Sequence, residues 1–579
     1  MNKKAIVLFI LVTALTFSNS LFNNFVGDDK EFILENPFYH SLKNIPLIFE
    51  QSYLTGNTIS YSLTKDEISS GEVAYRPVLS LTYFFDYWLW KTNAFGFHLH
   101  NLTLHIFNVI LVYFLLIRIL KNNRIAFFSA LLFGIHPVQT EAVNNIGYRT
   151  DILFSFFTLL SLHLYFTWIN TQHKSGKYYF LSHLFYFLAL FTKEAGLVMP
   201  ILILAYHGHF QKQDLRISPR SMFSRYGGYV LISLFYVFIY FKVFRNITIA
   251  SHNFFGENIF THATTMLWIF SLYLRDLCLP FFVKIIPPLY APDIQSYLMA
   301  KAVSSVLLLV LFLRTIQRSY HTEKMISFFL LWYLIYLLPV ANFIPLDNPM
   351  SHRFLYLPTI GFFAAVGILI EKLCNQLKNL NISPKIGTFI KLCIVGICIN
   401  STITLNTYWK NNISVADILV ENYPKNIKSH RMLGLECFKR GHYQKAGKLF
   451  TKCVTLGSKD PRDFHLLGIA LLDKPGEADT FFKRFPRYGS PYVVLGRKHV
   501  LNKEYEQALP LLEKSIELTP TYIGIGYLLQ VYMRLDQPMN ARSLMELAKK
   551  FVHNEGQIRI LQMILEQQRN SLEPIDIGL

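Results

Sequence analysis

Residues 3–31 read KKAIVLFILVTALTFSNSLFNNFVGDDKE, and this stretch decides the class of fold. Two lysines precede an apolar run from Ala5 to about Phe22, close to the ~20 residues that a helix needs to cross a bilayer. Two adjacent carboxylates, Asp28 and Asp29, follow within a few residues. The run is similar to a signal peptide, but no small-x-small cleavage site is clear and further apolar runs follow. We therefore interpret it as an uncleaved first span.

The composition of the whole chain extends this interpretation. Of the 579 residues, 52% are hydrophobic types and 16% are charged, and the mean hydropathy is +0.30. Soluble domains carry roughly 25% charged residues, which argues against a wholly soluble protein. The net charge of +19 would indicate nucleic acid on a soluble chain, but on an apolar chain it reflects basic cytoplasmic loops. We expect the lipid bilayer, and no nucleic acid, as a partner.

Ten further apolar runs approach the length or the half-length of a span. They lie at about 98–118, 125–143, 151–169, 178–192, 196–207, 226–244, 299–317, 325–344, 355–372 and 387–408. The Lys and Arg clusters between them fall on one side if the apolar segment 264–283 is interfacial or re-entrant. The sequence thus predicts a multi-pass membrane domain over residues 1–408, with about 11 spans, a cytoplasmic N-terminus and a non-cytoplasmic C-terminal part.

The chain changes character after Trp409, where it becomes charged and repetitive. Leu433-Gly434 recurs 34 residues later as Leu467-Gly468, and a third Leu-Gly pair follows at 495–496. A 34-residue period with Leu-Gly, then Ala, then a large apolar residue and Pro is the tetratricopeptide pattern. Residues 409–579 are therefore predicted to form an α-solenoid of stacked helix pairs, and the whole chain is predicted to be all-α.

The acidic pair is the first candidate site. Adjacent carboxylates near an apolar surface should have raised and coupled pKa values, which suits a general base acting on a hydroxyl group. An acidic helix cap or a solvated loop explains Asp28 and Asp29 equally simply. Nothing in the sequence requires a metal, although such a pair is a potential ligand for a divalent cation.

Polar residues also gather in the next predicted outer turn. His136, Glu141 and Arg149 bring an imidazole, a carboxylate and a guanidinium to one membrane face. Such groups often line a cavity or a substrate path, and ordinary capping of two helices is the alternative. His98, His100 and His105 follow helical spacing without a carboxylate companion, so we interpret them as packing or path-lining groups.

Four more residues are candidates for holding a phosphate. Lys193 stands in a tight turn between two short runs, and it either binds a phosphate or caps the turn. Arg353 and Tyr356 lie one helical turn apart at the outer surface, where they can hold a lipid phosphate or anchor the helix among headgroups. Arg76 in the first loop carries the same two interpretations.

Seven motifs together resemble one known family. They are FVGDDKEFILENP (25–37), YRPVLSLTYFFDYWLW (75–90), FGFHLHNLTLHIFN (95–108), LLFGIHPVQTEAV (131–143), YRTD (148–151), LFTKEAG (190–196) and SHRFLYLPTIGF (351–362). The set resembles the transmembrane and tetratricopeptide-repeat-containing O-mannosyltransferases and their bacterial relatives, which are similar to protein O-mannosyltransferases of the GT-C fold. The weakest match is 245–298.

The resemblance implies a chemistry as well as a fold. It implies that a sugar, mannose or another hexose, is transferred from a polyprenyl-phosphate donor to Ser or Thr hydroxyls of a polypeptide on the outer or lumenal face. The family's acidic pair falls on Asp28 and Asp29, one of which would be the base. Arg149, Lys193 and Arg353 are the candidates for neutralising the phosphate, attack opposite the phosphate would invert the anomeric centre, and the repeats would hold the acceptor.

Three other functions remain open at this stage. An O-oligosaccharyltransferase or ligase-like enzyme also carries terminal repeats by resemblance, but such enzymes use a long late outer loop, and the one at 345–354 is short. A non-catalytic membrane scaffold would only display the repeats. A transporter is disfavoured by the odd span count and the lack of two similar halves. We expect a bacterial inner membrane rather than an endoplasmic reticulum membrane.

Overall fold

The computed structural model describes twelve ranges of the chain. They are 3–49, 75–171, 175–211, 219–243, 259–285, 298–343, 349–381, 383–458, 460–470, 489–518, 520–551 and 555–567. All regular secondary structure in these ranges is helical, which confirms the all-α prediction. Within them the chain forms two compact units, divided between Val415 and Ala416.

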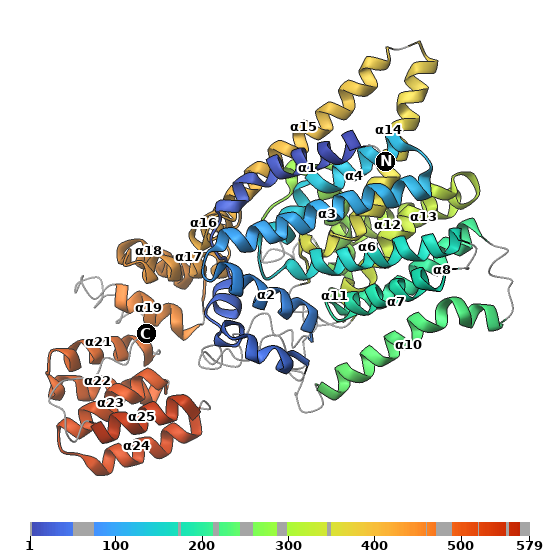
Figure 1. Cartoon of the computed structure of the whole chain (residues 1–579). Helices are drawn as coiled ribbons and strands as arrows, with labels where there is room; N and C mark the ends of the chain where they lie inside the picture. The colour runs from blue at the N-terminus through green and yellow to red at the C-terminus, as the bar shows by residue number, and fades with distance from the viewer. Residues whose placement is uncertain are drawn as a thin grey trace. The chain divides into compact units, whose positions relative to one another are not determined.

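The first unit is an assembly of fourteen α-helices within the described ranges (Figure 1). They are α1 Lys3–Phe17, α2 Pro77–Trp90, α3 Ala94–Leu120, α4 Asn123–Ile135, α5 Thr140–Asn144, α6 Arg149–Asn170, α7 Gly176–Leu190, α8 Met199–Phe210, α10 Pro219–Val243, α11 Ile259–Cys278, α12 Leu298–Thr322, α13 Lys324–Leu337, α14 Pro358–Asn379 and α15 Pro384–Tyr408. Short helical segments at 18–22, 30–34, 37–40, 42–49, 137–139, 194–198, 280–282, 338–340 and 352–355 lie between them.

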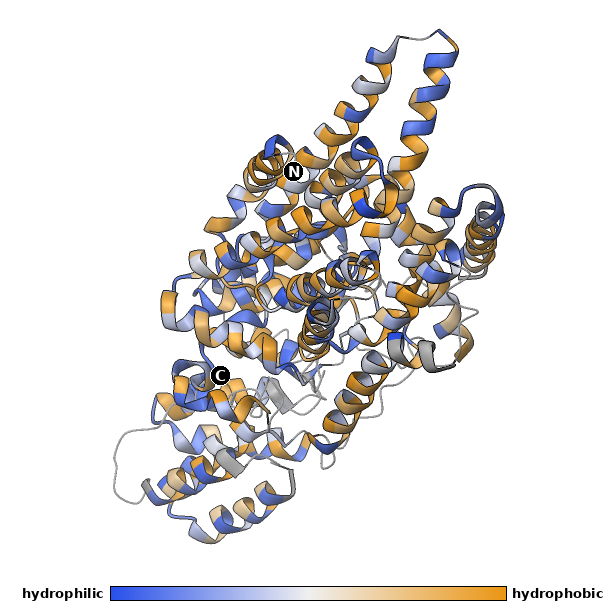
Figure 2. Ribbon diagram, turned by 45° about the vertical axis from the view of Figure 1, so that its right-hand side comes forward, coloured by the Kyte–Doolittle hydropathy of each residue, from blue (hydrophilic) through white to orange (hydrophobic). Residues whose placement is uncertain are grey.

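Seven helical segments among the described residues are long and apolar enough to cross a membrane. They are Lys3–Phe22, Ala94–Leu120, Arg149–Asn170, Arg225–Val243, Lys301–Thr322, Pro358–Asn379 and Pro384–Tyr408, and Asn123–Ile135 and Lys324–Val340 are shorter apolar helices. Most helices of the first unit are hydrophobic along much of their length (Figure 2). The chain is a multi-pass membrane protein, and the count of eleven spans stays a prediction.

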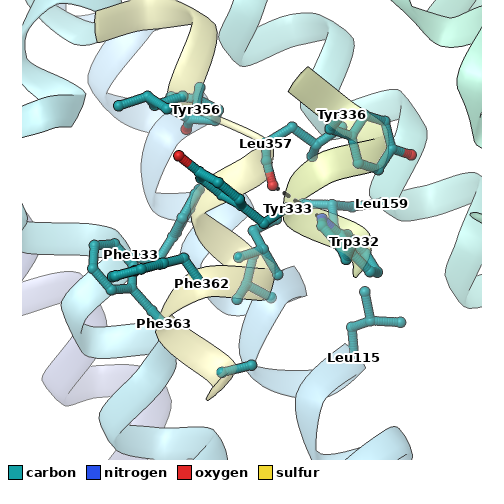
Figure 3. Packing of buried hydrophobic residues seen from close by; sticks show 14 of the residues in the cluster. Leu115, Phe133, Leu159, Trp332, Tyr333, Tyr336, Tyr356, Leu357, Phe362 and Phe363 are labelled. Carbon is teal, nitrogen blue, oxygen red and sulfur yellow. Dashed lines mark hydrogen bonds between the residues drawn. The ribbon is translucent and has the colours of Figure 1, made fainter. Parts of the chain in front are cut away.

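Large side chains fill the middle of the first unit. Trp332 of α13 is buried, and its indole N–H donates to the backbone oxygen of Leu357 at 3.1 Å (Figure 3). α13 and α14 come so close that a Cβ on Gly361 would lie 2.3 Å from the backbone oxygen of Phe329. A glycine is therefore required at this crossing, in the first turn of α14.

The second unit consists of consecutive helix pairs. Its helices are the later part of α16 Asn412–Asn422, then α17 Ile427–Lys439, α18 Tyr443–Thr455, α19 Pro461–Ala470, α21 Gly489–Leu501, α22 Tyr505–Leu518, α23 Tyr522–Arg534, α24 Pro538–Phe551 and α25 Glu555–Gln567. A Cβ on Gly496 would lie 2.4 Å from the side chain of Leu512, and one on Gly434 would lie 3.0 Å from Phe450. Small residues thus stand where paired helices pack closely, as the repeat pattern predicts.

Candidate active site

The acidic loop is joined to the turn between α5 and α6. The Asp29 carboxylate accepts hydrogen bonds from the backbone N–H groups of Gly147 at 2.7 Å, Ile146 at 3.1 Å and Val26 at 3.3 Å. Asp29 is buried, whereas its neighbour Asp28 is exposed. The two carboxylates of the pair therefore have different environments, and only Asp28 faces outward.

The close approach of Asp29 depends on a glycine. A Cβ on Gly147 would lie 2.9 Å from Asp29 Oδ1, closer than such contacts occur. Burial raises the pKa of Asp29 to about 7 even though three N–H donors oppose the rise, and the nearby Asp28 charge adds to it. The hydrogen bonds of Asp29 thus hold the 145–148 turn against the acidic loop.

Asp28 is presented by a backbone turn. Gly27 adopts φ +62°, which favours glycine, and its N–H donates to Asn412 Oδ1 at 2.7 Å. The Asp28 backbone oxygen accepts from Phe32 N at 2.9 Å, so a helical turn follows the pair at once. This local geometry holds Asp28 on the outside of the loop.

Glu141 joins the α5 turn to the segment before α14. Its carboxylate is buried and accepts from Ser351 Oγ at 2.5 Å and from the backbone N–H groups of His352 at 2.6 Å and Arg353 at 3.2 Å. Three donors on one carboxylate fix the backbone at 351–353. Glu141 is therefore positioned to support Arg353.

Arg353 lies over an aromatic ring next to the acidic pair. Its guanidinium carbon is 4.0 Å from the centre of the Tyr148 ring, and its Nε donates to Ser351 Oγ at 3.2 Å. Burial raises the pKa of Tyr148, and its hydroxyl lies within electrostatic range of Arg353, Glu141, Asp28 and Asp29. Tyr148 thus lies at the centre of the candidate site.

Helix α11 contributes residues that the sequence analysis did not assign. The Tyr273 hydroxyl accepts from Ser351 N and donates to Ser351 O, both at 3.1 Å. Asp276 is buried, and its carboxylate contacts His352 Nε2 at 2.9 Å and Arg275 Nε at 2.8 Å. The only available signal was an Arg-Asp pair inside an apolar helix.

The phosphate-binding role predicted for Arg149 does not fit the structure. Its side chain is fully buried and forms an ion pair with Asp86 of α2. The remaining guanidinium donors reach Asn101 Oδ1 at 2.6 Å, Thr82 Oγ1 at 3.1 Å and the backbone oxygen of Phe97 at 3.1 Å. Arg149 holds α2, α3 and α6 together.

Asp86 also corrects the expectation for the α3 histidines. Its Oδ1 lies 2.6 Å from His100 Nδ1, so this histidine does have a carboxylate companion. The partner comes from α2, 14 residues earlier, which sequence spacing on α3 could not reveal.

Tyr356 points into the helix packing rather than toward a donor. Its buried hydroxyl lies 2.6 Å from His105 Nδ1 and accepts from Asn108 Nδ2 at 3.1 Å. His105 Nε2 faces the backbone oxygen of Gly134 at 3.0 Å, which places the proton on Nε2. Tyr356 therefore belongs to a polar cluster that joins α3 to the start of α14. Because its hydroxyl is buried and already bonded within this cluster, the structure does not support its predicted role in binding a phosphate.

His136 caps the turn that leads to Glu141. Its Nδ1 accepts from Val138 N at 3.4 Å, and its ring centre lies 4.9 Å from that of Phe363. His136 thus has a supporting role in this structure.

The two remaining predicted cations are both paired. Lys193 Nζ lies 2.6 Å from Asp151 Oδ1, and both side chains are less than one-tenth exposed. Arg76 is buried and donates to Glu194 Oε1 at 3.3 Å. Within the described residues, no group of three or more His, Cys, Asp or Glu side chains is arranged to hold a metal ion.

Three curated relatives of the chain all carry the name protein O-mannosyl-transferase. No family model matches the chain. It is 24% identical over 467 residues to a protein O-mannosyl-transferase of Caenorhabditis elegans, covering 78% of this chain and 62% of that protein. It is 33% identical over 159 residues to the protein O-mannosyl-transferase TMTC3 of Mus musculus (27% and 16%), and 30% over 203 residues to TMTC1 of Homo sapiens (34% and 22%).

These curated homologues are protein O-mannosyl-transferases by name, and their family is the TMTC family of protein O-mannosyl-transferases. This confirms the resemblance found in the motifs. The chain spans less than two thirds of the length of each of these relatives. Among solved structures, the chain is similar to the archaeal oligosaccharyltransferase AglB from Archaeoglobus fulgidus, which was solved in complex with an inhibitory peptide and a dolichol-phosphate. The TM-score is 0.39, and the identity is 14% over 74% of this chain and 59% of that chain.

Proposed function

We propose that the chain is a membrane glycosyltransferase that moves a hexose from a polyprenyl-phosphate donor to Ser or Thr hydroxyls of a polypeptide. The observation that supports the proposal best is the exposed Asp28, which lies within electrostatic range of Tyr148, the residue whose ring Arg353 covers, and which is next in sequence to the buried Asp29. The names of the homologues support mannose as the sugar. The active site faces away from the cytoplasm, in a bacterial inner membrane.

The reaction assigns one role to each group. Asp28 takes the proton from the acceptor hydroxyl while that oxygen forms a bond to the anomeric carbon. The bond between this carbon and the phosphate oxygen breaks, and the phosphate leaves with the electron pair beside Arg353. Attack from the side opposite the phosphate inverts the anomeric centre. Asp29 and Glu141 position the two loops, and the repeats of the second unit bind the acceptor polypeptide.

The test is a comparison of three carboxyl variants in membranes supplied with labelled polyprenyl-phosphate hexoses and an acceptor peptide. Asp28→Asn should lower turnover by roughly 10²–10⁴, the usual worth of a general base, with donor affinity and protein level little changed. Glu35→Gln is the matched control, because Glu35 is an exposed acid in the same loop that pairs with Lys30 at 3.0 Å. It should keep wild-type turnover.

Two results would contradict the proposal. Normal activity per molecule in a double variant, Asp28→Asn with Asp29→Asn, would remove the acidic pair from catalysis. Transfer of whole oligosaccharides, with no transfer of single hexoses, would favour an oligosaccharyltransferase.

A further inference from the structure

Tyr148 lies where the turn after α5 leads into α6, as the first residue of the YRTD motif. Its side chain is half-buried, so part of it is open to a ligand. Its backbone N–H donates to Asn145 Oδ1 at 3.1 Å, but its hydroxyl group has no hydrogen-bond partner in the part of the chain that the structure describes. The hydroxyl therefore has a hydrogen bond to offer that the fold does not use.

The ring of Tyr148 lies against the guanidinium of Arg353. The guanidinium carbon is 4.0 Å from the centre of the Tyr148 ring and 5.1 Å from the centre of the Phe354 ring. Stacking of this kind engages the faces of a guanidinium, whereas its N–H donors point outward in its plane. A phosphate that these donors bind therefore lies near the rim of the tyrosine ring, to which the hydroxyl is attached.

The electrostatics place the hydroxyl on the Arg353 side of the site. Of the ionised groups that act on it, Arg353 has a larger effect than Glu141, Asp28 or Asp29. In the proposed reaction the base removes a proton from the acceptor, and Arg353 stabilises the departing phosphate. A group closer to Arg353 than to the acidic pair is thus expected to contact the phosphate rather than the acceptor hydroxyl.

The Tyr148 hydroxyl keeps its proton at neutral pH. Burial raises its pKa above the usual value of a tyrosine, and the charges of Glu141 and Asp28 add to the rise, while Arg353 opposes it. A neutral hydroxyl donates one hydrogen bond. A fixed donor of this kind stabilises an oxygen that gains negative charge as its bond to carbon breaks.

Hydrogen bonds on both sides hold the backbone of Tyr148 in place. Asp29 accepts from the N–H groups of Gly147 at 2.7 Å and Ile146 at 3.1 Å, directly before Tyr148. The backbone oxygen of Tyr148 accepts from Asp151 N at 3.1 Å, within the first turn of α6. Because the backbone is fixed before a ligand arrives, little ordering of this residue remains to be done on binding.

We propose that the Tyr148 hydroxyl donates a hydrogen bond to a phosphate oxygen of the polyprenyl-phosphate donor, beside the guanidinium of Arg353. The face of the ring stacks on Arg353, and the hydroxyl binds the same phosphate. This inference rests on the proposed function and adds to it a second residue that binds the phosphate.

The experiment measures Kd for polyprenyl phosphate, with and without a hexose, using the full-length chain in detergent. Tyr148→Phe keeps the ring beside Arg353 and removes only the hydroxyl. Kd for both ligands should rise roughly 10–100-fold, the usual effect of losing a hydrogen bond to a charged group. The thermal midpoint should not change, because the hydroxyl has no partner among the described residues. Polyprenol, which lacks the phosphate, should bind to the wild type and the variant with equal affinity.

Tyr83 of α2 provides a matched control. It is buried, the guanidinium carbon of Arg149 is 5.3 Å from its ring centre, and its hydroxyl donates to the backbone oxygen of Ile146 at 3.2 Å. Tyr83→Phe therefore removes a hydroxyl from another tyrosine that lies beside an arginine and contacts the same turn. This variant should lower the thermal midpoint and leave Kd for polyprenyl phosphate unchanged.

The outcomes distinguish this contact from the proposed function. An unchanged Kd for polyprenyl phosphate in Tyr148→Phe, or an equal rise in Tyr83→Phe, would overturn the contact. A rise confined to the ligand that carries a hexose would place the hydroxyl on the sugar and would overturn it too. If Kd rises as expected but the wild type transfers no hexose, the proposed function fails and the phosphate contact stands. If the wild type binds neither ligand, both fail.

Discussion

Replacement of Glu141 is the most informative perturbation of the site, because one buried carboxylate holds the whole 351–353 backbone. In Glu141→Ala, the N–H groups of His352 and Arg353 and the Ser351 hydroxyl all lose their acceptor. An unsatisfied buried donor costs about 1–3 kcal/mol, so the two N–H groups alone should cost about 2–6 kcal/mol of local stability. We expect Arg353 to lose its fixed position over Tyr148.

The assay is the dissociation constant for a polyprenyl-phosphate hexose, measured together with the thermal midpoint in detergent. Each loss of about 1.4 kcal/mol in the free energy of donor binding raises Kd tenfold. Because part of the lost local stability should weaken donor binding, we expect Kd to rise about 10–100-fold. Glu141→Gln should stay within about fivefold of wild type. Its amide oxygen can accept both N–H groups, which share Glu141 Oε2, and its NH₂ can donate to Ser351 Oγ.

The control for general destabilisation is Glu371→Gln. Glu371 binds Lys391 at 2.6 Å and lies 13 residues into α14 from its first residue, Pro358, about 20 Å along the helix. This variant should lower the thermal midpoint without changing Kd. A Glu141→Ala protein that is less stable but binds the donor with wild-type affinity would refute the positioning role.

Two further predictions concern Asp29 and Arg353. Because the pKa of Asp29 is raised to about 7, the folded chain keeps a proton that the unfolded chain loses near pH 4. The stability of the folded chain should therefore fall as pH rises from about 4 to about 7 and then level off. Asp29→Asn should flatten this part of a plot of thermal midpoint against pH. An unchanged slope in Asp29→Asn would assign the titration to another group. Arg353→Ala should weaken donor binding more than Arg353→Lys, because a guanidinium binds phosphate bidentately and stacks on Tyr148, whereas an ammonium is a point charge. Wild-type donor affinity in both variants would exclude Arg353 from the donor site.

Much of the architecture could be predicted from the sequence. Apolar runs of about 20 residues and a 34-residue repeat are local signals along the chain. The apolar runs lead to helices because backbone hydrogen bonds must be satisfied within each segment in lipid, and the repeat indicates stacked helix pairs. The acidic pair was also recognisable, because Asp28 and Asp29 follow an apolar run within a few residues. The motifs indicated a resemblance to one family, and the chain is similar to curated proteins of that family.

The partners of individual side chains could not be predicted in this way. Arg149 and Lys193 both looked like phosphate ligands, yet they pair with Asp86 and Asp151, which lie on other helices. Tyr356 seemed to be at a membrane surface, but it bonds to His105, 251 residues earlier in the chain. A residue type gives the charge, whereas packing decides whether that charge is already neutralised.

The sequence by itself determined a helical membrane protein with an acidic first loop and a repeat domain, because hydropathy and period act over short distances along the chain. Only the tertiary structure decided that Asp28 is exposed and Asp29 buried, and that Arg353 stands over Tyr148. The contact between Glu141 and Ser351 spans 210 residues, and it exists only when α5 and the start of α14 are packed together. Distances of that kind depend on how helices fit side by side, and no local pattern encodes them.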